Sequence, residues 1–224
     1  MSIKLLKLIL SVFIVNSLWG IDRVSYADQD AVRPGESVWL SESIECKHVK
    51  YLRSLAETTI DILIATRGVI AKNQELINRD PISGNYYFKG FVPAVVGSQV
   101  ANDFSLITGH YLKQTSLKLR NSSNAPDEWE KKVLKKLELA GHSGNAGFGE
   151  ILEVDDKEIY RYMKPIYVES ACLECHGEKE KIRPAIKQFL EMRYPHDEAY
   201  GYKEGDFRGG ISITISLERL GSEK

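Results

Sequence analysis

The chain has 224 residues, and its formal net charge is only −1 at pH 7. So balanced a charge gives no reason to expect nucleic acid or anionic lipid as a partner. The length suits one compact domain with enough chain to bury a cofactor. The sequence shows no internal repeat and no low-complexity stretch.

Residues 1–27 have the pattern of a secretory signal peptide. Two lysines precede an apolar stretch over residues 8–19, and a Ser-Tyr-Ala triplet ending at Ala27 offers a small-x-small cleavage site. The apolar stretch is short for a transmembrane helix. The alternative is an uncleaved anchor, because the segment between Gly20 and the cleavage site is long and charged. We expect an exported protein, periplasmic or in an equivalent compartment, loosely attached to the membrane if uncleaved.

After a lead over residues 28–40, we expect one domain over residues 41–224. Its first element is a long helix over about residues 41–78, because apolar side chains recur at helical spacing. Cys46 lies at the edge of this apolar stripe. The stripe comprises Val49, Leu52, Ala56, Ile60, Leu63, Arg67 and Ile70.

The remaining elements alternate between helical and strand patterns. They are a helix at 91–105, a strand at 111–121, a helix at 124–141, a hairpin at 149–168, a helix at 182–192 and a strand at 211–217. The helix at 124–141 has Pro126 near its start, acidic residues in its first turn and Gly141 as its stop. Nothing in this order demands a parallel crossover, so we predict an α+β fold with a small antiparallel sheet.

Two cysteines and a histidine form the strongest motif, since Cys172 and Cys175 stand two residues apart and His176 follows directly. A thioredoxin-like pair should open a helix after the first strand of a βαβ unit, whereas this pair follows a hairpin late in the chain. Zinc would need two further ligands, and no second pair has finger-like spacing.

In an exported protein, C-x-x-C-H is typical of covalent haem attachment. Each thiol would form a thioether with a haem vinyl group, and His176 would be an axial ligand of the iron. The motif occurs once, so we expect one haem c. Tyr167, Tyr202 and Arg208 are candidate pocket or propionate residues, or ordinary sheet and loop residues.

The second axial position stays open on the residues alone. Cys46 would be an unpaired thiol in an oxidising compartment, and an iron-bound thiolate would be protected there. A buried apolar role or an intermolecular disulfide would also account for it. By residue type, the other candidates are Met163, Met192, His48, His110, His142 and His196.

Three segments carry a resemblance to a known family: "KPIYVESACLECHGEKE", "YPHDEAYGYKEGDFRGGISITISL" and "QTSLKLRNSSNAPDEWEKKVL". They resemble a bacterial c-type haem domain family with a PAS-like fold, long described as a domain of unknown function. It includes a cyanobacterial single-haem protein with mixed Cys/His ligation. The last segment follows the family pattern Arg-Asn-x-x-Asn-x-x-Asp-x-Trp-Glu, from Arg120 to Glu130, but has Ser122 where the family usually has proline. The resemblance covers about residues 40–218.

The resemblance implies a PAS-like antiparallel sheet behind a long N-terminal helix. It also implies His176 as proximal ligand and a cysteine of that helix as distal ligand, which only Cys46 can match. Thiolate ligation stabilises ferric iron, so we predict a low-potential electron-transfer cytochrome with an unknown redox partner. Two strong axial ligands leave no open site on the iron, so we expect no enzyme activity.

The alternative is a haem-based redox or gas (CO/NO) sensor acting through a separate partner, because a thiolate could leave the iron on reduction. The sequence ends at Lys224, soon after the last strand, which favours the electron carrier. The oligomeric state stays open.

Overall fold

The computed structural model of this protein describes residues 36–144 and 146–221. The chain divides into two compact units, residues 1–46 and 47–224, and the description below concerns the second. The predicted signal peptide lies outside the described residues, as does the predicted lead up to residue 35.

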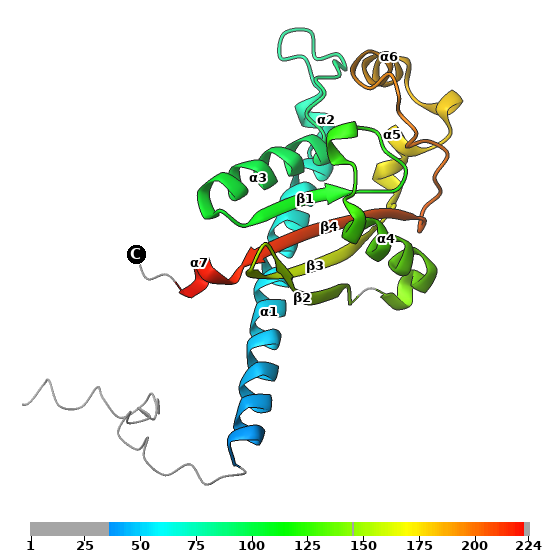
Figure 1. Cartoon of the computed structure of the whole chain (residues 1–224). Helices are drawn as coiled ribbons and strands as arrows, with labels where there is room; N and C mark the ends of the chain where they lie inside the picture. Colours follow the sequence, from blue (N-terminus) through cyan, green and yellow to red (C-terminus); the bar gives the residue numbers. More distant parts are fainter. Residues whose placement is uncertain (1–35, 145, 222–224) are drawn as a thin grey trace, which may run out of the picture. The chain divides into compact units, whose positions relative to one another are not determined.

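A four-stranded antiparallel sheet forms the centre of the fold, with the strand order β1-β4-β3-β2 (Figure 1). The strands are β1 (Tyr111–Thr115), β2 (Phe148–Val154), β3 (Lys157–Tyr167) and β4 (Phe207–Ser216). Together with a long N-terminal helix, this sheet confirms the predicted α+β fold.

The long helix α1 (Glu36–Lys72) and helix α3 (Pro93–Thr108) pack against the sheet and form its main core. The predicted apolar stripe of α1 is confirmed in the middle of the helix. The helix begins earlier than predicted and stops at Lys72, where the short helix α2 (Gln74–Ile77) replaces its expected last turns. The core comprises Leu52, Ala56, Ile60, Leu63, Ala101, Leu112, Tyr160, Tyr162, Ile211, Ile213 and Ile215.

Helix α4 (Glu128–Ala140) covers a second core, in which Val133, Leu134 and Leu137 surround Met163 of β3. Asp127 caps this helix, because its carboxylate accepts a hydrogen bond from the Glu130 N–H while the Glu130 carboxylate accepts one from the Asp127 N–H. This capping box explains why the helix starts at Glu128, four residues after the predicted start, while Ser122–Asn124 forms a separate 3₁₀ turn.

The predicted hairpin is confirmed as β2 and β3. Asp155 and Asp156 form its two-residue turn, with φ angles of 52° and 59° that suit a type I′ turn. In contrast, β1 ends at Thr115, well before the predicted end of that strand. The ladder with β4 ends at the pair Thr115 and Gly210, and beyond it the Ser116 hydroxyl, a side-chain group, donates to the Arg208 carbonyl at 2.7 Å.

Strand β4 starts before the predicted residue 211, because a pair of glycines continues the strand. A side chain at Gly209 would lie 2.3 Å from the Thr115 carbonyl oxygen, and one at Gly210 would lie 2.7 Å from the Met163 side chain. Glycine therefore allows close packing here, where the pattern had suggested a loop.

The segment between β3 and β4 carries the cysteine motif. It contains the 3₁₀ turn η3 (Ser170–Cys172), the short helix α5 (Leu173–His176) and helix α6 (Pro184–Arg193), and the last strand leads into α7 (Leu217–Gly221). The predicted helix at 182–192 is thus confirmed as α6. Within residues 36–144 and 146–221, none of the helices combines the length and apolar character that a membrane span requires.

Candidate functional site

The cysteine motif lies on one continuous helical segment directly after β3. The turn η3 ends at Cys172, whose N–H donates to the Glu169 carbonyl at 2.9 Å, and α5 carries Cys175 and His176. Neither cysteine of the motif forms a disulfide, and both are partly exposed. Two thiols and an imidazole are therefore presented together within little more than one helical turn.

The imidazole of His176 has a defined tautomer. Its Nδ1 lies 2.8 Å from the Ala199 carbonyl oxygen, which can only accept a hydrogen bond. Nδ1 therefore carries the hydrogen, and Nε2 keeps its lone pair. The Tyr202 ring meets the imidazole edge-on, with ring centroids 6.1 Å apart.

The environment keeps His176 neutral. Burial lowers the pKa of His176 to about 3, and the positive charges of Arg120, Arg208 and Arg67 act in the same direction, against the hydrogen bond to Ala199. A histidine that binds a metal must be neutral. The site thus holds the imidazole ready for coordination at ordinary pH.

The thiol of Cys175 differs from that of a redox-active pair. Burial raises its pKa to about 11, although the Arg120 charge opposes the change. A reactive thiol of the thioredoxin type has a lowered pKa and is partly ionised. The environment of Cys175 therefore does not favour the redox reading of this motif.

Arg120 holds the motif turn against the segment that orients His176. Its Nη2 donates to the Cys175 carbonyl at 2.6 Å and to the Ala199 carbonyl at 3.2 Å, while its Nε forms an ion pair with Asp197 at 2.7 Å. Sequence reasoning included Arg120 only in the family pattern and missed this positioning role. The family pattern pointed to Arg120, but the residues that Arg120 contacts, Cys175, Asp197 and Ala199, lie more than 50 positions further along the chain.

Two of the three predicted pocket residues lie at this site. The Arg208 guanidinium lies 5.3 Å from the centre of the Tyr202 ring, which in turn contacts His176. The hydroxyl of Tyr167 donates to the Gly141 carbonyl at 2.5 Å and its ring stacks on His142, and it shares only a cavity wall with Tyr202. An irregularity in the β3–β4 register between Ile166 and Tyr167 accompanies this change of direction.

The candidates for the second axial position are spread over the molecule. Met163 is completely buried beneath α4, and Met192 is 76% exposed on α6. His48 and His196 are also exposed. Cys46 belongs to α1, but its side chain lies outside the described residues, so its assignment stays a prediction.

Arg67 is an α1 residue whose charge acts directly on the motif. It interacts electrostatically with Cys172 and Glu169, and it helps to lower the pKa of His176. Sequence reasoning placed Arg67 within the apolar stripe and drew nothing further from it. The sequence did contain a clue to this role, because Arg67 is a charged residue on the face of the helix that is otherwise apolar.

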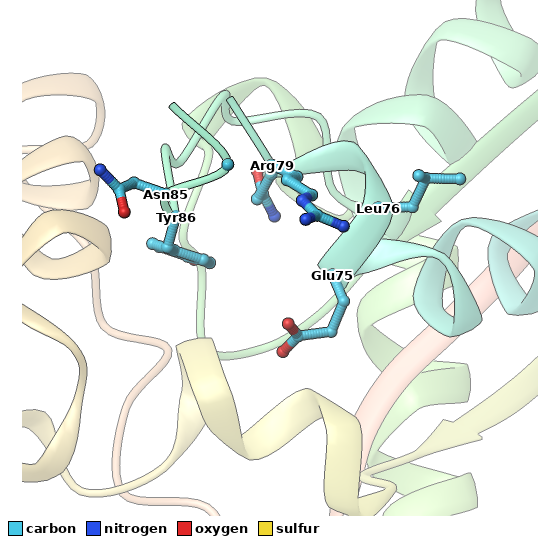
Figure 2. A pocket seen from close by; sticks show the side chains of 7 residues that line it. Glu75, Leu76, Arg79, Asn85 and Tyr86 are labelled. Atoms are coloured by element: carbon cyan, nitrogen blue, oxygen red, sulfur yellow. The ribbon is translucent and has the colours of Figure 1, made fainter. Parts of the chain in front are cut away.

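A cavity of about 390 Å³ lies between α2 and the loop that follows it (Figure 2). Burial raises the pKa of Tyr86 in the cavity wall, although the Arg183 charge opposes the change. No cysteine or histidine is among the lining residues. They are Glu75, Leu76, Asn78, Arg79, Gly84, Asn85 and Tyr86.

Tyr202 lines a second cavity, also of about 390 Å³, together with Lys118, His142 and Tyr167. Among the described residues, no group of three or more histidine, cysteine, aspartate or glutamate side chains is arranged to hold a metal ion. In that part of the chain, His176 therefore does not belong to a metal cluster built by the protein alone.

Comparison with known proteins identifies the family. The model of the Tll0287-like family (Tll0287) matches residues 48–216. The crystal structure of the cyanobacterial heme-protein Tll0287 is similar in fold, with a TM-score of 0.58 and 24% sequence identity over 73% of this chain and 94% of that chain. No curated protein matches the chain. The family model covers well over half of the sequence, and the chain belongs to the Tll0287-like family.

Proposed function

We propose that the chain is an exported c-type cytochrome that binds one haem through Cys172 and Cys175, with His176 as an axial ligand. The C-x-x-C-H motif supports this proposal, as does the similarity to a protein described as a heme-protein. The signal-peptide pattern over residues 1–27 adds a compartment in which such attachment takes place.

The geometry of His176 is the observation that carries the proposal. Its Nδ1–H is committed to the Ala199 carbonyl at 2.8 Å, so Nε2 is left for an iron atom. Cys172 and Cys175 lie on the same helical segment with unpaired sulfurs. The residues present therefore fit a covalently held haem, which when bound supplies one-electron iron chemistry.

The chain itself supplies attachment, orientation and charge. The two thiols would anchor the cofactor, Ala199 fixes the imidazole, and Arg120 ties the carbonyls of Cys175 and Ala199 to one guanidinium. Such a rigid set of ligands suits electron transfer, because little rearrangement accompanies a change of oxidation state. We therefore propose electron transfer as the role of the protein.

Ligation by Cys46 is the part of the proposal that rests on the sequence and the family resemblance alone. Its thiolate would lower the reduction potential relative to a methionine ligand.

The test is optical absorption of the exported, haem-loaded protein beside a Cys46→Ala variant and a Met192→Ala control. A ferric six-coordinate spectrum with a thiolate-to-iron charge-transfer band, lost in Cys46→Ala and kept in Met192→Ala, would establish Cys46. Identical ferric spectra for all three proteins would remove Cys46 and the low-potential argument with it. A protein that carries no covalent haem after export would refute the cytochrome itself.

Carbon monoxide separates the two functional classes. An electron carrier with two retained axial ligands should not bind CO when reduced. Ready CO binding by the reduced protein would show that a ligand leaves the iron or that a coordination position is open, and the gas-sensor alternative would then replace electron transfer.

A further inference from the structure

Arg67 of α1 and Arg208 of β4 come from distant parts of the chain, and the carboxylates that act on them, Glu169 and Asp197, do so without a direct ion pair. Among the described residues, none of the ion pairs includes either arginine. Arg120, in contrast, lies 2.7 Å from Asp197. Arg67 and Arg208 thus differ from Arg120 in that they lack a carboxylate at ion-pair distance.

Neutral groups hold both guanidinium groups in place. Arg67 donates from Nη1 to the Gln114 amide oxygen, and Gln114 itself donates to the Ala94 carbonyl at 2.9 Å. Arg208 donates from Nη1 to the Ser116 hydroxyl at 2.6 Å and to the Lys118 carbonyl at 3.1 Å. These contacts orient the side chains without neutralising their charges.

Partial burial makes the charges of both arginines costly. Their hydrogen-bond partners Gln114 and Ser116 are two residues apart in the chain, so the two guanidinium groups lie close together. Burial lowers the pKa of Arg67 and that of Arg208, but an arginine stays protonated in proteins despite such effects. An anion bound between two such partly buried cations would stabilise both.

Both arginines lie near the motif. The Tyr202 ring contacts both Arg208 and His176. Arg67 lies close to Arg208, because it binds Gln114 while Arg208 binds Ser116, two residues further along the chain. An anion bound between the two guanidinium groups would therefore lie next to the cysteine motif.

We propose that Arg67 and Arg208 form one carboxylate-binding site, and that its ligand is the propionate edge of the haem held by Cys172, Cys175 and His176. Guanidinium groups match carboxylates in shape and charge, and a haem carries two carboxylates. The inference rests on the proposed function. A free oxyanion shares the same chemistry and is the other possible source of the charge.

The first experiment measures the reduction potential of the haem-loaded protein as a function of pH, in the wild type, Arg67→Gln and Arg208→Gln. Loss of a positive charge near the haem favours ferric iron, so both variants should have lower midpoint potentials. A propionate that loses its arginine should also titrate at a higher pH, which makes the potential pH-dependent near neutrality. Arg183→Gln is the matched control, because Arg183 is exposed beside the motif and stacks on Tyr86.

A conservative variant separates charge from shape. Arg67→Lys keeps the charge but loses the planar fork, so its potential should stay near that of the wild type. The propionate bending bands in resonance Raman spectra should shift in Arg67→Lys and in both glutamine variants, and not in Arg183→Gln. Unchanged potentials and unchanged propionate bands in both glutamine variants would overturn the proposal.

Titration with inorganic phosphate distinguishes the two sources of the anion. If the propionates occupy the site, the haem-loaded wild type binds no phosphate in calorimetry. Saturable phosphate binding by that protein, lost in Arg67→Gln and Arg208→Gln, would overturn the assignment to propionates in favour of a free oxyanion. If the exported chain carries no covalent haem, the proposed function itself fails, and this outcome is recognised separately by haem staining.

Discussion

Two clusters of charged side chains in this domain differ in whether each cation has an anionic partner. Near the start of α4, Lys113 lies 2.8 Å from Glu130, and Arg161 lies 2.7 Å from Asp127. Each cation there has an anion of the same chain beside it. At the cysteine motif, Arg67 and Arg208 have only neutral hydrogen-bond partners.

The difference suits a structural network near α4 and the proposed anion site at the motif. Glu130 is completely buried and forms ion pairs with both Lys113 and Arg161, so the charges of that network are paired within the chain. The motif arginines have no ion-pair partner among the described residues, and a bound anion would provide one. The family pattern spans both regions, because Arg120 belongs to the motif while Asp127 and Glu130 belong to the network near α4.

The largest expected effect lies at the motif. In a Cys172→Ala, Cys175→Ala double variant, covalent haem attachment should be lost entirely, because no thioether can form. Haem staining after denaturing electrophoresis measures this directly. The Cys46→Ala variant is the control and should keep its covalent haem. Staining that persists in the double variant would mean that another residue carries the attachment.

Removal of the Glu130 carboxylate should destabilise the folded protein, because Glu130 pairs with both Lys113 and Arg161. Glu130→Gln leaves the mostly buried Lys113 without its ion-pair partner and Arg161 with Asp127 alone, so the free energy of unfolding should fall by about 3–5 kcal/mol. Urea denaturation followed by circular dichroism gives the value. Glu128→Gln, at an exposed position of the same helix, should change stability by no more than about 0.5 kcal/mol. Equal effects of the two variants would contradict a structural role for the network.

The same network should contribute a pH-dependent part of the stability. Burial raises the pKa of Asp127, but hydrogen bonds from Arg161 and from the Glu130 N–H outweigh it, so the folded pKa lies below the usual value. This stabilisation is present above the unfolded pKa of about 3.9 and is lost as the pH falls through the folded value.

Asp127→Asn keeps a helix-capping residue but removes the ion pair with Arg161. Because Asp127 is half exposed, the loss of stability at neutral pH should be at most about 1 kcal/mol. Urea midpoints of the wild type and the variant should converge as the pH is lowered below about 4. A constant difference at all pH values would show that the carboxylate does not act through its charge.

The smallest effect is expected at the β2–β3 turn, where neither cluster is involved. Changing Asp155–Asp156 to Asn-Gly should stabilise the fold by about 0.4–1 kcal/mol, because both positions have positive φ angles that Asn and Gly adopt more readily. Asp155→Ala should have the opposite sign. The melting temperatures of the two variants, compared with that of the wild type, measure the effect. They show how large a stability change is when neither a buried ion pair nor a ligand is involved.

Local patterns in the sequence determined the elements and the chemistry of the motif. Helical periodicity located α1, strand patterns located the hairpin, and the spacing of Cys172, Cys175 and His176 indicated haem attachment. Each of these features depends on residues that are neighbours in the chain, and short-range rules describe such features well.

Tertiary structure alone decided how the motif is completed. Ala199 orients His176, and Arg67 of α1 and Arg208 of β4 both act on the motif from elements far apart in the sequence. Tyr167 is directed away from it where the β3–β4 register changes. These outcomes depend on how the helices and strands pack, and a contact between distant segments leaves no periodic signal in either of them.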